Sequence, residues 1–108
     1  MGEGLDVDRL RAAVRQLRVE WQRHALERMA EREIRRADVL EVLRSGELIE
    51  EYPEDRPFPS GLFFGRTGTR PIHVVVALDG ARERAFVITV YEPDLEHFEP
   101  DFKTRRKA

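Results

Sequence analysis

The segment IHVVVALDGARERAFVITVYEP, residues 72–93, decides the fold class. It holds two runs rich in β-branched and aromatic residues, 72–78 and 84–92, with the turn dipeptide Asp79-Gly80 between them. Runs of this composition separated by a short turn predict two antiparallel strands. Pro93 ends the second strand, because proline has no N–H to donate to a neighbouring strand.

The two strands should have unlike faces, because successive side chains point to opposite sides of a sheet. The face expected to pack on helices carries Ile72, Val74, Val76, Leu78, Phe86, Ile88 and Val90. The opposite face carries His73, Val75, Ala77, Val87, Thr89 and Tyr91. Since this second face is apolar in the middle and polar at one end, it is either partly solvated, covered by the C-terminal segment, or a binding surface.

Two further strands precede this pair. Residues 47–54 predict the first of them, and residues 62–66 predict the second, followed by a turn at residues 67–69. Pro57 and Pro59 fix the backbone and predict a rigid, irregular loop between these strands. Because the connections are short, successive strands are expected to pair antiparallel as a meander.

The N-terminal half predicts helices. Residues 6–17 place apolar side chains at i, i+3, i+4 and i+7, with Asp6 as the N-cap. A second helix is expected over residues 21–33 and a third over residues 36–45, which Gly46 ends by accepting the left-handed conformation. We therefore predict an α+β fold, with two to three N-terminal helices packed on one face of a three- to four-stranded antiparallel β-meander.

Composition limits the classes of function. The 108 residues suffice for a single domain, expected over residues 1–108, and a hydrophobic share of 41% supports a core. The net charge is -2, from 21 acidic and 19 basic residues, which disfavours a strongly basic nucleic-acid binder and a polyanionic protein. The absence of cysteine excludes disulfides and thiol catalysis. No apolar run reaches the roughly 20 residues that span a bilayer, and the N-terminus lacks a secretory signal, so we expect a cytoplasmic protein without membrane contact.

The expected second helix carries the most suggestive polar side chains. His24, Arg28 and Arg32 follow i, i+4, i+8 spacing, so they are neighbours on one helix face, which Arg35 extends. We call these first three residues the helix ladder. Guanidinium groups bind an oxyanion and an imidazole moves a proton near neutral pH, a combination that suits phosphate chemistry. The alternative is a solvated stripe that pairs with nearby carboxylates.

Further candidates lie in the strand half and at the C-terminal end. His73 lies in an apolar strand, where a lone histidine is more often a core residue than a catalyst. It becomes a candidate if Tyr91 or Thr89 lies directly across the sheet, since a hydroxyl orients the imidazole ring. His97 is expected to be solvated. The basic residues 103–107 predict a frayed, solvated end, with contact to nucleic acid or to a partner's acidic groove as the alternative.

No metal and no cofactor is expected. The histidines form no pair with metal-ligand spacing in a convincing setting, and the arginine one turn beyond His24 would repel a cation. Gly65 and Gly68 lack the lysine and the following helix of a phosphate-binding loop. Neither Ser45 nor Ser60 has the flanking glycines of a nucleophile elbow.

These residues resemble the small bacterial and archaeal family catalogued as domain of unknown function 4258. The matching blocks are His24-Ala25, Arg28-Met29, Glu31-Arg32, Ile34, Asp38-Val39, Leu43 and Gly46-Glu47; Ile49-Glu50, Tyr52, Asp55, Pro57, Pro59-Ser60 and Leu62; Pro71, His73-Val74-Val75 and Ala77; and Ile88-Thr89-Val90-Tyr91-Glu92-Pro93-Asp94. They span about residues 21–98, so the first helix (6–17) and the basic tail (103–108) lie outside the resemblance. Two positions depart from the family pattern: Glu33 stands where glycine is usual, and Phe98 stands where the aromatic residue is often tryptophan.

The resemblance implies an activity by analogy of fold alone. The helix–helix–sheet layout of the family is similar to that of toxin ribonucleases of the RelE and BrnT kind, which cut RNA without a metal. Residues of this chain that would fill the catalytic roles are His24, Arg28, Arg32, His73 and Tyr91. A histidine would be the general acid or base, the two arginines would clamp the scissile phosphate, and Tyr91 would orient the substrate.

Two functional hypotheses follow. The favoured one is a protein-interaction or self-associating module, motivated by the near-neutral charge and the half-apolar sheet face. The helix ladder would then be an ion-pair network with Glu27, Glu31, Asp38 and Asp55. The alternative is a toxin-like, metal-independent endoribonuclease that acts on RNA and pairs with an antitoxin-like protein. Convergence of the five candidate residues on one cleft would support the enzyme.

Overall fold

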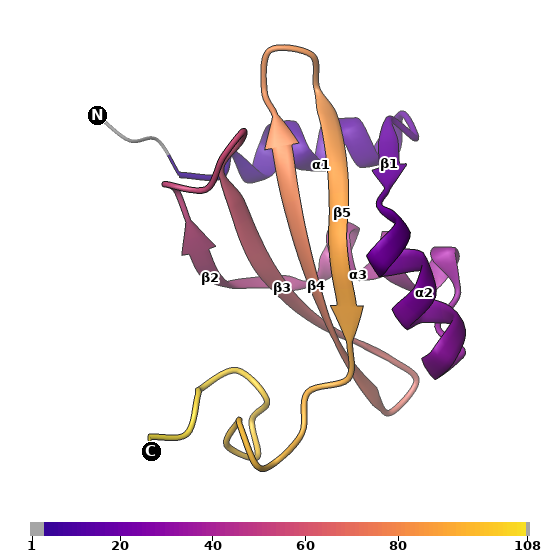
Figure 1. Ribbon diagram of the computed structural model, residues 1–108, viewed down its shortest axis with the longest axis vertical. Helices are drawn as coiled ribbons and strands as arrows, with labels where there is room; N and C mark the ends of the chain where they lie inside the picture. Colours follow the sequence, from indigo (N-terminus) through magenta and orange to yellow (C-terminus); the bar gives the residue numbers. More distant parts are fainter. Residues whose placement is uncertain (1–3, 108) are drawn as a thin grey trace.

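The computed structural model describes residues 4–107 and confirms an α+β fold (Figure 1). The helices in this range are α1 (Val7–Arg15), α2 (Arg23–Arg32) and α3 (Arg36–Ser45), and the strands are β1 (Val19–Trp21), β2 (Glu47–Tyr52), β3 (Ser60–Thr67), β4 (Arg70–Asp79) and β5 (Arg84–Tyr91). The strands form one sheet in the order β1-β5-β4-β3-β2. No helix among the described residues is long and apolar enough to cross a membrane.

The predicted antiparallel meander is present as β2 to β5, each strand pairing with the next. β1 makes the sheet five-stranded, one strand more than predicted. It pairs in parallel with β5, with Val19 opposite Ala85 and Trp21 opposite Val87. Trp21 therefore ends a strand, whereas the sequence predicts it as the start of a helix. Three residues are too few to show alternation, so this strand is determined by its neighbour rather than by its own pattern.

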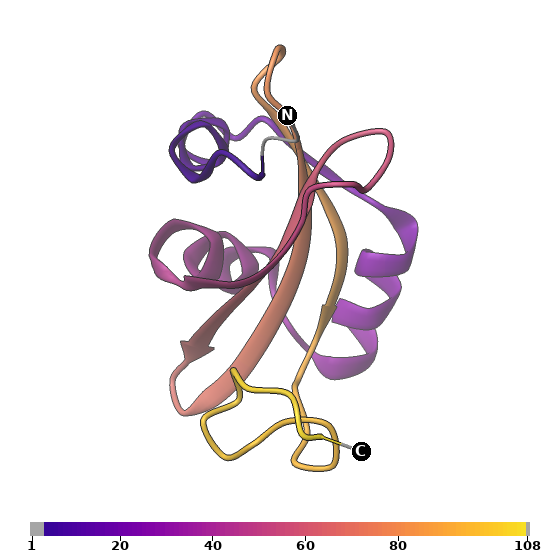
Figure 2. The ribbon, with the colours of Figure 1, turned by 90° about the vertical axis from the view of Figure 1, so that its left-hand side faces the viewer.

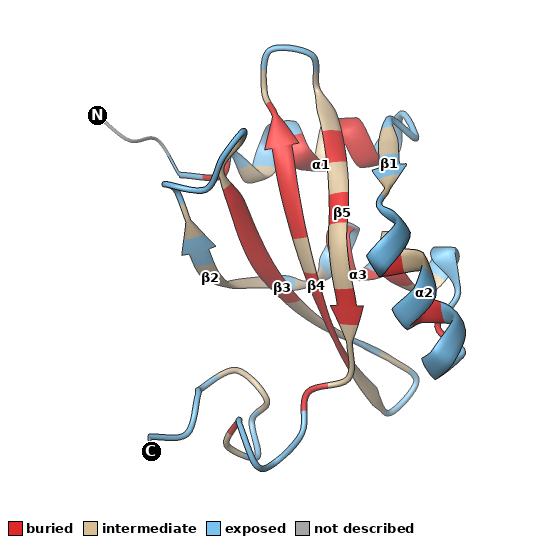
Figure 3. Cartoon of the chain, in the orientation of Figure 1, coloured by how far each residue is buried: buried red, intermediate tan, exposed pale blue. Residues whose placement is uncertain are grey.

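The helices are distributed unevenly around the sheet. α1 and α3 lie together against one side of the strands, and α2 runs beside the lower half of β5 (Figure 1, Figure 2). The core that they share with the sheet includes Leu10, Val14, Ala25, Met29, Val39, Leu43, Phe63, Val74 and Val76. Figure 3 shows burial concentrated in β3, β4 and β5, while α2 and the C-terminal segment expose much of their length. The outer surface of α2 is thus free to present polar side chains.

A β-bulge in β5 corrects the predicted faces of that strand. Val75 pairs with Thr89 and Val76 pairs with Val87, so Ile88 is an extra residue without a partner on β4. The buried residues of β5 are Ala85, Val87 and Val90, and Phe86 and Ile88 lie half-buried on the other side, beside Ala77. The prediction that Phe86 and Ile88 pack on the helices is wrong, because alternation assumes an uninterrupted strand.

The helix ends lie close to the predicted positions, but glycine has a different role from the one expected. Asp6 caps α1 as predicted. Gly46 ends α3 with extended backbone, φ -80° and ψ -176°, and not in the left-handed conformation. A Cβ there would lie 2.4 Å from the carbonyl oxygen of Val42 and 2.6 Å from that of Phe64, so close packing requires glycine. Left-handed backbone follows α2 instead, where Glu33 has φ 56° and ψ 45° at the position where glycine is usual in the resembling family.

The C-terminal segment, residues 93–107, turns back below the ends of the strands and is not the frayed end that its sequence predicts (Figure 2). Its basic side chains form the ion pairs Lys103–Glu47 (3.2 Å), Arg105–Glu50 (2.7 Å) and Arg106–Glu99 (3.2 Å). Two of these acids belong to β2, so the segment is fastened to the far edge of the meander. It covers the polar end of the outer sheet face, which is one of the three outcomes that the sequence leaves open.

Candidate functional site

The helix ladder lies on α2 and faces the end of β5. His24, Arg28 and Arg32 are exposed, because the buried residues of this helix, Ala25 and Met29, take its other side into the core. Between α2 and the end of β5 lies a pocket of about 280 Å³, lined by His24, Arg28, Arg32, Thr89, Val90, Tyr91, Glu92 and Asp94. Four of the five predicted site residues therefore line one pocket.

Two carboxylates line this pocket, and each already has a partner. Glu92 forms an ion pair with Arg70, with Oε2 2.9 Å from Nε. Asp94 accepts hydrogen bonds from the His97 imidazole at 2.8 Å and from the backbone N–H groups of Glu96 and His97. The bond from the His97 side chain is the main cause that lowers the pKa of Asp94. Both acids are thus engaged with groups outside the ladder, and neither forms an ion pair with a ladder residue within the described part of the chain.

The two arginines of the ladder keep most of their hydrogen-bonding capacity. Arg28 lies 3.6 Å from Glu31 in an ion pair whose side chains are 49% and 62% exposed. Pairs of this kind contribute about 0–1 kcal/mol to stability. Arg32 has no ion-pair partner within residues 4–107. Guanidinium N–H groups on both residues are therefore free to donate to phosphate oxygens.

The ion-pair network predicted for the ladder does not form. Of the four carboxylates named for it, Glu31 alone contacts a ladder residue. The others have partners elsewhere: Glu27 pairs with Arg23 (3.3 Å), Asp38 pairs with Arg35 (3.3 Å), and Asp55 accepts a hydrogen bond from Ser60. The network fails because Asp38 and Asp55 are held by residues close to them in sequence, so they do not reach α2.

His73 is the predicted site residue that the pocket does not include. Its side chain is fully buried, and it lies directly opposite Tyr91 in the sheet. Nε2 lies 2.7 Å from the carbonyl oxygen of Phe102, which only accepts, so this nitrogen carries the proton. Nδ1 lies 3.2 Å from the Tyr91 hydroxyl and accepts its hydrogen. Burial is the main cause that lowers the pKa of His73, which keeps the imidazole neutral near pH 7.

The C-terminal segment seals His73 from solvent. The Phe98 ring meets the imidazole edge to face, with ring centroids 4.7 Å apart. Arg105 lies over Phe98, 4.9 Å from its centroid, and binds both oxygens of Glu50 at 2.7 and 3.2 Å. Tyr52 donates to the same carboxylate, and burial is the main cause that raises the pKa of Tyr52 to about 12. His73 therefore lies buried beneath a partly exposed polar cluster of Glu50, Tyr52 and Arg105, and its own imidazole is closed to substrate.

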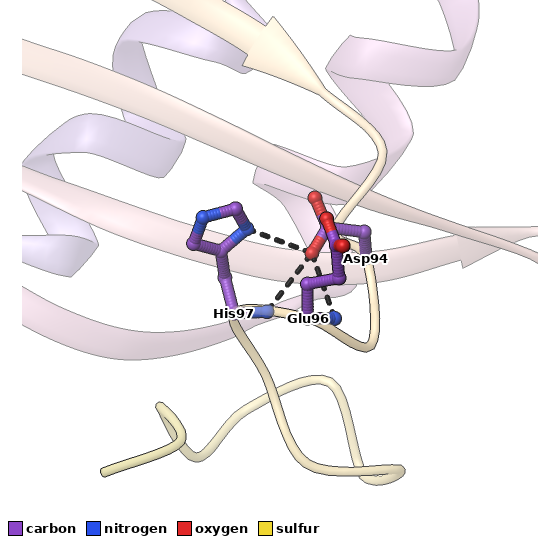
Figure 4. A group of neighbouring side chains, drawn as sticks. All are labelled: Asp94, Glu96 and His97. Atoms are coloured by element: carbon purple, nitrogen blue, oxygen red, sulfur yellow. Dashed lines mark hydrogen bonds and ion pairs between the residues drawn. The ribbon is translucent and has the colours of Figure 1, made fainter. Parts of the chain in front are cut away.

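A turn beside the pocket gathers three side chains that can bind metal. Ligand atoms of Asp94, Glu96 and His97 lie within 4.8 Å of one another (Figure 4). All three residues are exposed. Asp94 already caps the turn through hydrogen bonds to two backbone N–H groups and to the imidazole, as Figure 4 shows. Turn geometry accounts for this cluster, because aspartate commonly bonds the backbone that follows it.

Thr89 and Arg70 belong to the site but are not among the residues that the sequence predicts for it. Thr89 lines the pocket. It lies two residues before Tyr91 in the same strand, so the sequence indicates that the two side chains share a face. Arg70 donates to the backbone carbonyl oxygens of Arg32 and Glu33 and also pairs with Glu92. It thereby ties the end of α2 to the end of β5. No local pattern indicates this role, because its partners lie more than 20 positions away in either direction.

The pocket combines the groups that phosphodiester chemistry needs. Two guanidinium groups can hold the non-bridging oxygens of a phosphate. The imidazole of His24, which is exposed in the same pocket, can exchange a proton with substrate and with solvent. The Tyr91 ring forms part of the wall, and its hydroxyl is committed to His73. The arrangement suits proton transfer at a bound phosphate ester.

A comparison with protein families matches residues 21–92, more than half of the chain, to the family described as Domain of unknown function (DUF4258). The matched range runs from the end of β1 to the residue after β5 and contains all five predicted site residues. No curated protein and no solved structure matches the chain. The expected likeness to RelE- and BrnT-like toxins therefore stays a prediction.

Proposed function

The chain belongs to the DUF4258 family, and for this member we propose a metal-independent endoribonuclease activity in the pocket between α2 and β5. The observation that supports it is the meeting of His24, Arg28 and Arg32 with Tyr91 around one pocket. An imidazole beside two available guanidinium groups provides a proton acceptor and charge stabilisation for phosphoryl transfer. RNA is the proposed substrate, and an antitoxin-like protein that covers the pocket is the proposed partner.

The proposed reaction transfers a phosphoryl group within one RNA strand. The 2′-oxygen forms a bond to the adjacent phosphorus, and the bond from phosphorus to the 5′-oxygen breaks. His24 accepts the proton of the 2′-hydroxyl, the departing 5′-oxygen takes a proton from solvent, and the imidazolium then releases its proton. The products are a 2′,3′-cyclic phosphate and a 5′-hydroxyl. Arg28 and Arg32 stabilise the charge that grows on the non-bridging oxygens. DNA lacks the 2′-hydroxyl and is not cleaved.

Tyr91 and His73 take positioning roles in this scheme. Because the Tyr91 hydroxyl donates to His73, the tyrosine ring is fixed as a wall of the pocket. His73 acts only through Tyr91, since its own imidazole is buried and both nitrogens are hydrogen-bonded. The role of general base therefore falls to His24 rather than to His73.

Incubation of the purified protein with total RNA, with and without a chelator, tests the proposal. We expect cleavage that the chelator does not change and fragments that end in a cyclic phosphate. A double variant with His24→Ala and Arg28→Ala should lose about 100-fold or more of the rate, because general acid–base catalysis alone contributes roughly 10²–10⁴-fold. Arg23→Ala is the matched control, because Arg23 is an exposed cation on the same helix outside the pocket. No cleavage by the wild type, or equal cleavage by wild type and double variant, would contradict the proposal.

A second candidate is a protein-interaction or self-associating module. The net charge of -2 and the half-buried rings of Phe58 and Phe86 on the outer sheet face support it. Val87, which the sequence places on that face, instead faces the core and contributes nothing to it. Light scattering and pull-down test this candidate. A strict monomer that captures no partner would count against it, whereas a stable dimer would favour it.

A further inference from the structure

A second pocket lies nearer the N-terminal end of β5 than the ladder pocket does. It is lined by residues that the proposed reaction does not use. Its volume is about 480 Å³, and its lining residues are Gln22, Asp55, Arg56, Pro57, Phe58, Ala77, Phe86 and Ile88. Phe58 comes from the loop between β2 and β3, and its ring is stacked on that of Phe86. The ring centroids are 5.6 Å apart and the planes differ by 10°. Both residues are half-buried, so part of this aromatic surface remains exposed.

The pocket exists because of two features of the sheet. The bulge at Ile88 places Phe86 on the outer face. Phe86 pairs with Ala77 on the neighbouring strand β4, and the small side chain of Ala77 leaves space beside the phenyl ring. The C-terminal segment covers the other end of this face at His73 and leaves this end open. This end of the outer face therefore has an aromatic hollow beside Ala77, at the position where the predicted alternation places Val87.

This aromatic pocket and the ladder pocket lie next to each other along the same two segments. On β5, Phe86 lines the first pocket and Tyr91 lines the second. Gln22, the residue before α2, lines the aromatic pocket, and His24 within α2 lines the ladder pocket. On β5 the first pocket is lined by residues 86 and 88 and the second by residues 89–91, so at about 3.3 Å per residue their centres lie about 10 Å apart along the strand. A few nucleotides of a single strand span such a distance.

The lining of the aromatic pocket matches the chemistry of a nucleobase. Aromatic side chains bind the faces of bases with little dependence on sequence. The Gln22 amide carries both donors and an acceptor, Asp55 supplies acceptors, and Arg56 supplies donors, so the pocket can satisfy the hydrogen-bonding edge of a base. All three polar residues are exposed. Asp55 accepts a hydrogen bond from Ser60 through one carboxylate oxygen, and Arg56 donates to backbone carbonyl oxygens through Nη1, so the other polar atoms of both side chains are left for a ligand.

We propose that the aromatic pocket binds a base of single-stranded RNA, a few nucleotides from the phosphate held by the helix ladder, through stacking on Phe58 and Phe86. This inference rests on the proposed nuclease function and adds the class of substrate. Only an unpaired strand can turn a base out to stack on these rings, because paired bases are already stacked on their neighbours. Duplex RNA should therefore bind more weakly than single strands of the same length.

Fluorescence anisotropy with a labelled single-stranded RNA, 2′-O-methylated to prevent cleavage, measures the effect of the rings. Phe58 is the position to change, because it lies in a loop and its loss leaves the strands intact. Phe58→Leu should weaken binding by about tenfold, the lower part of the range for losing one aromatic–base stack. Phe58→Trp should keep the wild-type affinity. Leu95→Ala is the control, because Leu95 is 51% exposed and lines neither pocket.

An abasic nucleotide moved along the same RNA locates the contact. Wild-type binding should weaken at one position, and Phe58→Leu should be insensitive there, because both changes remove the same stack. Wild-type protein that binds no RNA overturns the nuclease function and this inference together. Wild-type binding that Phe58→Leu leaves unchanged, or equal affinity for duplex and single strand, overturns the inference alone. Retention of RNA binding by Phe58→Leu with loss by Phe58→Trp would show that side-chain size, and not ring stacking, governs binding, and it would also overturn the inference.

Discussion

Burial decides what each histidine of this molecule can do. His24 is exposed and lines the ladder pocket. His73 is fully buried, and both of its ring nitrogens are occupied, one by the backbone at Phe102 and the other by Tyr91. An imidazole that cannot reach solvent or substrate cannot relay a proton between them. Proton transfer at this site is therefore assigned to the one candidate imidazole that solvent reaches.

We predict that His73 makes the folded state less stable as the pH falls below its ordinary pKa. The pKa of His73 is lowered in the folded state, mainly by burial, so below about pH 6.5 the unfolded chain binds a proton that the folded chain does not. This contribution is fully present above the ordinary pKa and is lost as the pH falls toward the folded pKa. Urea unfolding at about pH 7.5 and about pH 5.5 measures it. His73→Gln should flatten the dependence and His24→Gln should keep it, and equal slopes in all three proteins would contradict the prediction.

The two tyrosines provide an independent measure of the polar cluster around His73. Tyr52 and Tyr91 are the tyrosines of the chain. Burial is the main cause that raises the pKa of Tyr52 to about 12 and raises that of Tyr91. The ultraviolet absorbance of tyrosinate in the folded protein should therefore develop well above pH 10, the ordinary value, and the urea-unfolded protein should titrate near pH 10. Tyr52→Phe should remove the part of the folded titration that lies near pH 12. A folded midpoint near pH 10 would show that the cluster is open to water.

Among the elements, α2 is held in place by a residue outside it. Arg70 bonds the last carbonyl groups of the helix and pairs with Glu92, and the Arg70 side chain is 31% exposed. We predict that Arg70→Ala lowers the free energy of unfolding by about 1–2 kcal/mol, because it removes charge-assisted hydrogen bonds. Arg28→Ala should change it by about 0–1 kcal/mol, because its pair with Glu31 is exposed. Thermal melts of both variants measure the difference. A larger shift for Arg28→Ala than for Arg70→Ala would mean that the ladder is structural.

The C-terminal end of α2 carries a strained residue that one substitution should relieve. Glu33 has φ 56° and ψ 45°, a left-handed conformation that costs a non-glycine residue roughly 1 kcal/mol. We predict that Glu33→Gly raises the free energy of unfolding by a few tenths of a kcal/mol to about 1 kcal/mol. Glu27→Gly, at an interior position of the same helix, should lower it by about 1 kcal/mol. Denaturant unfolding compares the two variants. If both glycines destabilise the protein equally, the backbone at residue 33 is not left-handed.

The elements also show which features a sequence can predict. β4 and β5 follow from runs of β-branched residues, β2 and β3 follow from short apolar stretches between turn signals, and the ladder follows from helical spacing, because all of these signals are local. β1 and the bulge at Ile88 are set by pairing with strands distant in sequence, so local alternation does not reveal them. The same holds for the site. Spacing and register bring the ladder to Tyr91, but the closure of His73 by Phe98 and the bridge made by Arg70 depend on contacts between distant segments.

For the molecule as a whole, the net charge of -2 is the main argument against RNA binding. Where the individual charges lie matters more for a bound phosphate than their sum. Many carboxylates are paired within the described part of the chain, as Glu50 is with Arg105 and Glu92 with Arg70. Such pairs remove one charge of each sign and leave the net charge at -2, whereas a phosphate in the ladder pocket meets Arg28, whose pair with Glu31 is exposed, and Arg32, which has no ion-pair partner among the described residues. A nearly neutral protein can thus hold an anion at one place, provided that few phosphates are contacted.

A small number of contacts predicts weak dependence of RNA binding on salt. Each phosphate of a single strand that is neutralised contributes about -0.7 to the slope of log affinity against log salt concentration, so Arg28 and Arg32 together predict a slope of about -1.4. Arg32→Gln should reduce the slope by about 0.7. Arg23→Gln should leave it unchanged, because Arg23 pairs with Glu27 outside the pocket. Anisotropy of a labelled single-stranded RNA over a series of salt concentrations measures all three proteins. A much steeper slope that Arg32→Gln does not alter would place the RNA on another surface, because counterion release would then come from cations outside the ladder.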